Sequence, residues 1–423
     1  MSRDEAVLWH GFTQMSSFAA NSPVIVERAE GRELIDVDGN RYLDAISSLW
    51  VTTLGHRVPE LDEAIAAQLG RIAHSTMLGN SNRVTIELAE ALSGVVPVDT
   101  PHFIFASDGA AAVEQALKIA FQFWANQGVS ERTSYLTLSS SYHGDSIGSL
   151  SLGSDGFSAS LFDPLRFPVL RAPGYDDPGW ADTAISMLRS HAARLAAVVI
   201  EPLVQGAAGM LMTTPADVRR LAEACQASGT LLICDEVATG FGRTGELFAS
   251  ERCGVRPDLL CLGKGLTGGY LPMSVTAASQ RVYNAFLGPD LGDRTFYHGH
   301  SYGGNALAAA VALRHLQLIQ EPDVLANVRA RSSQLKHLLQ DRVMPSPWVR
   351  AARVTGLMTG IELAPPTPGL RWGRRVCAAA TGHGVLLRPL GDVIVVVPPL
   401  TTTAAEIERI VDVIARSLCE VCR

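Results

Sequence analysis

The sequence predicts an α/β fold, with a mostly parallel central sheet in a large domain and a smaller α+β domain built from both ends of the chain. Three observations support this prediction. The 423 residues are too many for one compact core. The middle of the chain alternates short apolar runs with longer helical patterns, and the two ends do not. We expect the domains to divide at 1–54, 55–305 and 306–423.

The elements follow in order along the chain. Residues 24–46 predict an antiparallel hairpin with Asp-Gly-Asn at its turn. Apolar runs of strand length then recur at 102–107, 134–140, 196–203, 231–236 and 258–264. Helical patterns occupy the segments between them, at 110–125, 181–195 and 217–229, the last of which ends at a glycine. A long helical pattern from Asn305 leads into a C-terminal segment with an apolar strand and a last helix. Strands that alternate with helices indicate parallel strands covered on both faces.

Composition argues against several classes of protein. The formal net charge is −7 and the chain has no run of Lys or Arg, so we expect no nucleic-acid or lipid-headgroup surface. No stretch approaches the roughly 18 apolar residues of a membrane span. The first residues, MSRDEAVLWHGF, lack the apolar core of a secretory signal. Seven scattered cysteines predict a reduced, cytoplasmic protein, and we expect no metal site.

The segment 231–245, LLICDEVATGFGRTG, resembles two nucleotide motifs and satisfies neither. A dinucleotide fingerprint needs its first glycine at the strand end, but residues 235–239 separate strand and glycines here. A magnesium-binding strand of a P-loop enzyme needs a G-x-x-x-x-G-K-[ST] motif, which the chain lacks.

GHSYG at 299–303 satisfies the pattern of a serine nucleophile elbow. Asp323 or Asp341, followed by His383, would complete a triad in the right order, although no HGGG-type segment lies upstream. A serine hydrolase is therefore an alternative hypothesis. It predicts a colourless protein that a serine-directed organophosphate inactivates.

Asp235 and Lys264 each lie at the end of a predicted strand. Because parallel strands end at the same edge of a sheet, we expect the two side chains to lie near each other, where such folds bind ligands. An amine that binds an aldehyde and a carboxylate that pairs with a ring nitrogen are what pyridoxal phosphate requires. A salt bridge at the sheet edge is the alternative.

Two further segments favour the cofactor. Gly109 and Ala110 follow Asp108 at a predicted helix start, where backbone N–H groups favour a phosphate, although an ordinary capped helix has the same pattern. Tyr142 follows a predicted strand and could stack on a flat ring, although buried tyrosines are common.

Five segments together resemble a known family. IEPLVQGAAGM, CDEVATGFGRTG, CLGKGLTGGY, SYHGD and HGHSYGGN occur in class III aminotransferases of the fold-type I pyridoxal phosphate family, over nearly the whole chain. The resemblance implies a PLP-dependent transferase fold type I, pyridoxal 5'-phosphate as cofactor, an amine donor and a keto acceptor as substrates, and a homodimer with shared active sites. In this family the glycines after the strand-end aspartate shape a loop near the active site.

The resemblance also implies roles for single residues. Lys264 would bind the cofactor aldehyde and move the proton between substrate and cofactor. Asp235 would pair with the ring nitrogen, and Tyr142 would stack on the ring. Gly109 and Ala110 would hold the phosphate through their backbone N–H groups.

Further residues would come from the partner subunit or bind the substrate. His300 and Ser301 lie where the partner subunit reaches the phosphate in this family. Arg388 would bind the substrate carboxylate, and the apolar LLRPLGDV around it predicts that it is not a surface side chain. The remaining lining residues of the substrate pocket would be Phe12, Trp50, Tyr142 and Gly299.

Within the family, LWHGFTQM, ISSLWVTTLGH and LLRPLGDVIVVVPPL are most similar to the biotin-pathway branch, which converts 8-amino-7-oxononanoate to 7,8-diaminononanoate. Many members that use S-adenosylmethionine as donor have two adjacent tryptophans at 49–50, tyrosine at 12 and Pro-Thr at 300–301. This chain has Leu49-Trp50, Phe12 and His300-Ser301, so we expect lysine as the donor. Another class III ω-amine transaminase acting on terminal amines is the alternative. A cofactor-binding protein without activity is a third, against which the intact Lys264 and Asp235 argue.

Overall fold

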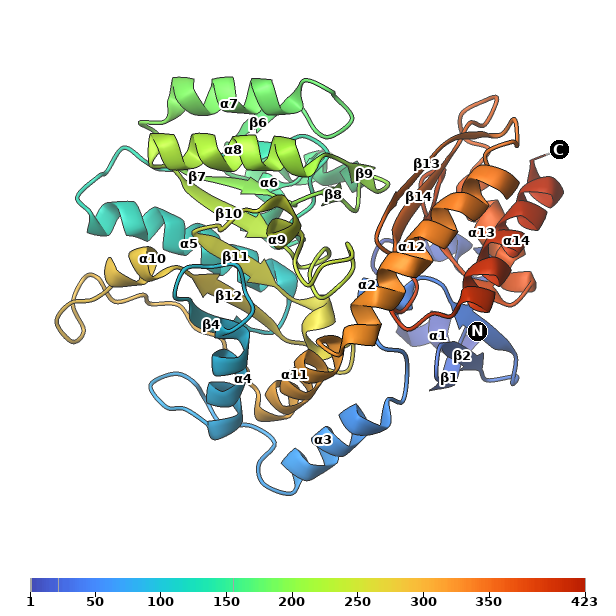
Figure 1. Cartoon of the computed structure of the whole chain (residues 1–423), viewed down its shortest axis with the longest axis horizontal. Helices are drawn as coiled ribbons and strands as arrows, with labels where there is room; N and C mark the ends of the chain where they lie inside the picture. The colour runs from blue at the N-terminus through green and yellow to red at the C-terminus, as the bar shows by residue number, and fades with distance from the viewer. Residues whose placement is uncertain (1, 22, 155, 423) are drawn as a thin grey trace.

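A computed structural model of the chain describes residues 2–21, 23–154 and 156–422, without the side chains of 156–159. Its centre is a seven-stranded sheet with the strand order β4-β12-β11-β10-β7-β5-β6 (Figure 1). The strands are β4 (His102–Ala106), β5 (Ser134–Leu138), β6 (Leu170–Ala172), β7 (Leu195–Ile200), β10 (Leu231–Asp235), β11 (Leu259–Leu262) and β12 (Ser274–Ala278). Only β12 runs antiparallel to its neighbours among these strands. The predicted mostly parallel α/β fold is confirmed.

Helices cover both faces of this sheet. Alternate residues of β7, β10 and β11 pack into two separate buried clusters, as the period of a strand requires. Val199 and Ile233 share a cluster with α5, whereas Val198 and Leu232 share one with α7 and α8. The helices of this region are α3 (Pro59–Leu69), α4 (Arg83–Ser93), α5 (Gly109–Asn126), α6 (Ile147–Leu152), α7 (Trp180–His191), α8 (Pro215–Ser228), α9 (Ala249–Cys253) and α10 (Gln280–Asn284).

Local sequence signals explain where these helices begin and end. The Asp108 side chain caps α5 by accepting the Ala111 N–H at 2.9 Å. Thr214 caps α8, and Pro215 occupies its first turn, where a missing N–H costs nothing. Gly229 ends α8 with a left-handed φ of 68°, as the sequence predicted.

The two ends of the chain meet in a second sheet with the order β1-β2-β3-β15. Its strands are β1 (Val26–Glu30), β2 (Glu33–Asp36), β3 (Arg41–Asp44) and β15 (Val385–Leu386). The predicted hairpin is confirmed as β2 and β3, whose turn is held by the Asp36 carboxylate through the Asp38 and Asn40 amides. Because β15 pairs in parallel with β3, residues from both termini form one unit.

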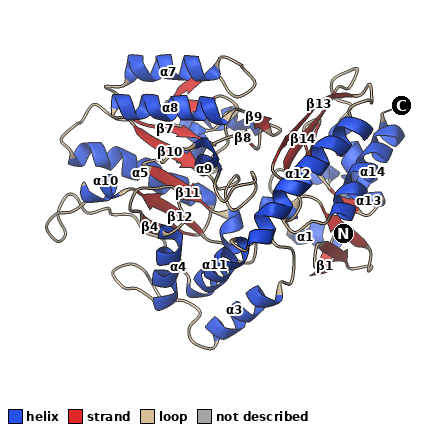
Figure 2. Ribbon diagram, viewed as in Figure 1, coloured by secondary structure: helices blue, strands red, loops and turns tan. Residues whose placement is uncertain are grey.

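A third sheet, β13-β14-β17-β16, lies beside three C-terminal helices (Figure 2). Its strands are β13 (Val349–Thr355), β14 (Met358–Leu363), β16 (Arg388–Leu390) and β17 (Val393–Val396). The helices are α12 (Pro322–Arg342), α13 (Trp372–Gly382) and α14 (Ala404–Val421), and α11 (Ala306–Ile319) leads into them. Short elements complete the chain: α1 (Ser2–Val7), η1 (Met15–Ser17), η2 (Ala19–Asn21), α2 (Ser47–Trp50), η3 (Gly156–Leu165), β8 (Val204–Gln205), β9 (Leu211–Met212) and η4 (Lys264–Thr267).

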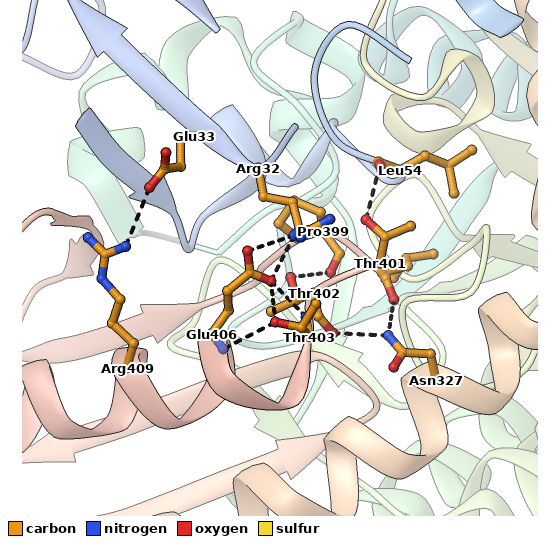
Figure 3. A network of polar contacts seen from close by, with 11 residues as sticks. Arg32, Glu33, Leu54, Asn327, Pro399, Thr401, Thr402, Thr403, Glu406 and Arg409 are labelled. Atoms are coloured by element: carbon orange, nitrogen blue, oxygen red, sulfur yellow. Dashed lines mark hydrogen bonds and ion pairs between the residues drawn. The ribbon is translucent and has the colours of Figure 1, made fainter. Parts of the chain in front are cut away.

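A polar network ties the N-terminal segment to the C-terminal helices (Figure 3). Arg32 Nε donates to both carboxylate oxygens of Glu406 at 2.9 and 2.7 Å, and Glu406 also completes the capping box of α14. Thr401 donates to the Leu54 carbonyl at 3.0 Å. The segment after β17 is therefore fixed to the chain that carries Trp50. The division 1–54, 55–305 and 306–423 stays a proposal.

No helix within the described residues is long and apolar enough to cross a membrane.

Candidate active site

Three segments meet at the carboxyl edge of the central sheet. Asp235 ends β10 and pairs in register with Cys261 of β11, and Lys264 follows β11 after one glycine. A Cβ built on that glycine, Gly263, would lie 3.3 Å from Val237 Cγ1 and 3.6 Å from Gly109 Cα. The strand-end acid, the strand-end amine and the start of α5 are thus neighbours, because parallel strands deliver their ends to one edge.

Lys264 lies in a strained turn against an aromatic ring. Its φ of 40° is in the left-handed region, which costs free energy for any residue but glycine. Its Nζ atom is 5.0 Å from the centroid of the Trp50 ring. Burial lowers the pKa of Lys264, and this outweighs the opposing charges of Asp235 and Glu201. A lowered pKa raises the fraction of uncharged amine, which is the nucleophilic form.

Asp235 is held by a buried histidine that sequence reasoning missed. His143 Nδ1 lies 2.7 Å from Asp235 Oδ2, and the other carboxylate oxygen accepts the Val237 N–H at 3.0 Å. Burial opposes protonation of His143, but Asp235 and Glu201 outweigh burial, so the pKa of His143 is raised. His143 Nε2 is buried and has no partner among the described residues. SYHGD contains this histidine, but nothing in the pentapeptide indicates a partner 92 residues away.

Glu201 is a second functional candidate that the sequence analysis did not single out. It is 5% exposed, and its carboxylate accepts the backbone N–H of Tyr142 at 3.0 Å and of Gly206 at 3.3 Å. Burial raises the pKa of Glu201 to about 7, with the negative charge of Asp235 adding to the rise and His143 opposing it. A Cβ on Gly206 would lie 3.0 Å from Trp50 Cζ3. Glu201 therefore fixes the backbone on both sides of the site.

Tyr142 is partly buried beside this group. Its hydroxyl donates to Asp145 at 2.9 Å, and burial, followed by this hydrogen bond, raises the pKa of Tyr142 well above its usual value. The phenol therefore stays protonated at any ordinary pH.

The start of α5 offers two free backbone donors. The Asp108 carboxylate accepts a hydrogen bond from the Ala111 N–H, and the Asp108 carbonyl accepts one from the Ala112 N–H. The backbone N–H groups of Gly109 and Ala110 therefore have no partner among the described residues. Gly109 also packs tightly, since a Cβ there would lie 2.5 Å from Val237 Cγ1. Free N–H groups at a helix start suit a phosphate.

The loop 299–301 lies beside the same helix start. His300 Nε2 is 2.9 Å from the hydroxyl of Ser107, the residue before Asp108. Ser301 is exposed, and its carbonyl accepts a hydrogen bond from His74 Nε2 at 2.8 Å. Gly299 packs against Leu78. The reach of this loop into a partner's site stays a prediction.

The predicted substrate residues differ in exposure. Trp50 is 8% exposed and lies at Lys264, whereas Phe12 is 60% exposed. The expectation that Arg388 is not a surface side chain was wrong, because Arg388 is exposed. Its strand β16 is the edge strand of its sheet and pairs with β17 alone, so apolar neighbours in sequence do not enclose it.

Two open hollows of about 540 Å³ lie elsewhere, one along α4 and one around residues 93–101, and neither is lined by Lys264 or Asp235. Within the described part of the chain, no group of three or more His, Cys, Asp or Glu side chains is arranged to hold a metal ion.

Comparison with known proteins identifies the family. The model of the family aminotransferase class-III matches residues 15–418. The chain belongs to the class III aminotransferases. This family uses pyridoxal phosphate, so the resemblance stated from the sequence is confirmed.

The chain is similar to other class III aminotransferases over nearly its full length. It is 44% identical to the adenosylmethionine-8-amino-7-oxononanoate aminotransferase of Nitratidesulfovibrio vulgaris, over 99% of this chain and 81% of that protein. The crystal structure of the enzyme with the same name from Methanocaldococcus jannaschii superposes with a TM-score of 0.96 at 36% identity, covering 99% of this chain and 98% of that one. An amine transaminase from an uncultivated Pseudomonas species, in its PLP-bound form, superposes at 0.92 with 32% identity, covering 98% and 99%.

Family membership removes the serine hydrolase hypothesis. GHSYG at 299–303 lies in a loop and turn, and the strand that precedes it, β12, ends at Ala278. A nucleophile elbow needs a strand directly before the serine.

Proposed function

We propose that this aminotransferase converts 8-amino-7-oxononanoate to 7,8-diaminononanoate in biotin synthesis. The observation that carries the chemistry is the partly buried Lys264 amine beside Asp235 at the sheet edge. The choice of substrate is supported by the names of relatives. The proteins from Nitratidesulfovibrio vulgaris and Geobacter sulfurreducens, 44% and 39% identical to this chain, are both called adenosylmethionine-8-amino-7-oxononanoate aminotransferases.

The residues present fit pyridoxal phosphate. The two free amides of Gly109 and Ala110 suit its phosphate. In this proposal, Ser301 and His300 of a second subunit would be further donors. The Asp235 carboxylate, oriented by His143, suits a protonated ring nitrogen, and the Tyr142 ring suits stacking. Bound there, the cofactor supplies an aldehyde that accepts and returns the amino group and a ring that withdraws electrons.

Lys264 is the catalytic residue in this proposal. Its amine would hold the cofactor aldehyde, and the free amine would act as the base that moves a proton between the substrate carbon and the cofactor carbon. The lowered pKa of Lys264 suits this work, because a base must be uncharged at the working pH to accept a proton. The Trp50 indole is buried and faces the Lys264 amine, so it limits the access of water to that amine.

The substrate pocket combines apolar walls with one cation. In this proposal, the aliphatic chain of the substrate would be lined by Trp50, Phe12, Gly299 and Tyr142. Arg388 binds the substrate carboxylate, because its guanidinium is exposed and no acidic side chain pairs with it among the described residues. A planar guanidinium suits the two oxygens of a carboxylate.

Two lines of support differ on the amino donor. The names of the relatives include adenosylmethionine, which favours S-adenosylmethionine. Leu49, where many such enzymes have a second tryptophan, removes a stacking surface and favours lysine. The preference for lysine stays a prediction, and both donors belong in the test.

The test is a donor panel with 8-amino-7-oxononanoate as acceptor, in which 7,8-diaminononanoate is measured by mass spectrometry. The proposal predicts product with lysine or S-adenosylmethionine. Turnover of simple terminal amines with no product from 8-amino-7-oxononanoate would contradict it. That result would favour the second candidate, an ω-amine transaminase, which the superposition on an amine transaminase supports. Bleaching of the cofactor absorbance by S-adenosylmethionine and not by lysine would overturn the preference for lysine.

A cytoplasmic homodimer is part of the proposal. Ser301 and His300 act across a subunit boundary in it, so the active unit contains two chains.

A further inference from the structure

His315 is a fully buried imidazole that has no part in the chemistry described above. It lies on α11, and its Nε2 atom is 2.6 Å from the hydroxyl of Thr53, three residues after Trp50. Its ring also packs against the turn that carries Lys264: a Cβ on Gly268, which ends that turn, would lie 3.0 Å from His315 Cδ2. One side chain therefore contacts both the Trp50 segment and the Lys264 turn.

The segment that His315 holds is strained. Ser47, Ser48 and Trp50 have φ values of 51°, 59° and 65°, which are unfavourable for residues other than glycine. Such conformations persist only where the surroundings enforce them. Asp44 enforces the first part, because its carboxylate oxygens accept the Ser48 N–H at 2.8 and 3.0 Å.

Thr53 fixes the end of the same segment. Its hydroxyl meets His315, and its carbonyl accepts the Leu400 N–H at 2.6 Å. Arg243 adds a hydrogen bond to the Thr52 carbonyl at 3.0 Å. The Thr53–His315 hydrogen bond links this segment directly to α11.

His315 acts as a neutral hydrogen-bonding group. Burial lowers the pKa of His315 to about 3, against the opposing effect of the Leu266 backbone, and the nearby Arg243 cation lowers it further. The imidazole is therefore uncharged at neutral pH, where it is a neutral donor or acceptor for the Thr53 hydroxyl.

We propose that His315 is a positioning residue which, through Thr53, holds the strained segment Ser47–Thr53 and so sets the Trp50 indole over the Lys264 amine. The proposal rests on the proposed function, because Trp50 is assigned there to the substrate pocket. Loss of the Thr53–His315 bond leaves the Thr53 side chain without its partner and loosens the end of the segment, so Trp50 can move and substrate binding weakens more than the chemical step.

The test is a double-mutant cycle in the full-length holoenzyme. His315→Phe keeps the ring and Thr53→Val keeps the shape, but each removes one partner of the same hydrogen bond. We expect each to raise KM for 8-amino-7-oxononanoate roughly tenfold, with kcat changed less than about threefold. The double variant should match either single variant, because both remove one interaction. Thr53→Ser, which keeps the hydroxyl, should restore the wild-type KM.

Hydrogen–deuterium exchange of the peptide 45–56 provides a readout that does not depend on turnover. We expect roughly tenfold faster exchange there in both single variants and no change in the strands of the central sheet. Thr359→Val is the matched control, because Thr359 is equally buried and its hydroxyl has no partner among the described residues. It should change neither KM nor exchange at 45–56.

Additive effects of the two substitutions, or a wild-type KM and wild-type exchange in His315→Phe, would overturn the proposal. Faster exchange spread over the whole chain would overturn it as well, because it indicates a merely structural role. A wild-type enzyme that does not aminate 8-amino-7-oxononanoate contradicts the proposed function instead, and the exchange at 45–56 still decides the role of His315.

Discussion

Three buried titratable side chains, Asp235, His143 and Glu201, set the charge around the Lys264 amine. The short His143–Asp235 contact of 2.7 Å keeps a carboxylate available at the sheet edge. Glu201 has a raised pKa of about 7, so it carries a full negative charge only above neutral pH. The charge near the Lys264 amine therefore depends on the protonation of Glu201, whose own contacts are with backbone N–H groups.

Glu201→Gln should change how stability depends on pH. In the folded protein the pKa of Glu201 is raised from 4.5 to about 7, so between these values the folded state keeps a proton that the unfolded state releases. The stabilising effect is complete below about pH 4.5 and is lost as pH rises through 7. Because glutamine does not titrate, the fall in unfolding free energy over this range should be smaller in the variant.

The measurement is urea unfolding of the cofactor-free protein at a series of pH values. Glu223→Gln is the control, because it makes the same chemical change at a glutamate that is exposed on α8. If the unfolding free energy of Glu201→Gln falls as steeply between pH 4.5 and 7 as that of the wild type, the raised pKa of Glu201 is contradicted.

At the scale of elements, the start of α5 depends on a close approach of three backbone segments. The ends of three elements pack closely here, because the Val237 side chain leaves no space for a Cβ atom on Gly109 and little space for one on Gly263. This packing explains why two free N–H groups of α5 can point at a ligand beside Asp235 and Lys264.

Gly109→Ala should weaken cofactor binding roughly tenfold or more, because the new Cβ would lie 2.5 Å from Val237 Cγ1 and force the helix start to shift. Titration of the cofactor absorbance measures the dissociation constant. Adding Val237→Ala removes the clashing methyl groups and should recover most of the affinity. Gly382→Ala, where no atom lies within 4 Å, is the control and should bind normally. Normal binding by Gly109→Ala would refute the close approach.

The strand pattern of the sequence predicted most of the central sheet, and the exceptions have physical causes. The five predicted strands are present, because fully buried strands give continuous apolar runs. β6 has only three residues, Leu170–Ala172, which is too short for a period to be seen. β12 follows the Lys264 turn without a helical pattern before it, and its antiparallel direction depends on pairing with β4, far away in the sequence.

At the scale of the whole molecule, both ends of the chain are needed to build one unit beside the site. β15 pairs with β3, and Arg32 pairs with Glu406, so residues more than 300 positions apart fix the segment that carries Trp50 (Figure 3). The sequence indicated such a unit from the lack of alternation at its ends. It could not indicate the His143–Asp235, Glu201–Tyr142 and Thr53–His315 contacts, because each depends on the folded geometry.

Large apolar side chains remain exposed on the single chain. Trp9 is 88% exposed, Phe12 60% and Tyr302, next to Ser301, 63%. The homodimer proposed above would cover part of this exposed apolar surface. We expect the protein to sediment as a dimer of about 90 kDa, twice the 45.1 kDa chain, in analytical ultracentrifugation. Ser301→Ala should weaken cofactor binding and leave the dimer intact. A fully active monomer would contradict this part of the account.

The covalent role of Lys264 is the central claim, and the composition makes it easy to test. The chain has three lysines, and the other two, Lys118 and Lys336, are exposed. Borohydride reduction of the holoenzyme followed by proteolysis and mass spectrometry should find the reduced cofactor on the peptide that contains Lys264, and on neither of the other two. A protein that stays unmodified, or that carries the cofactor on Lys118 or Lys336, would contradict the account.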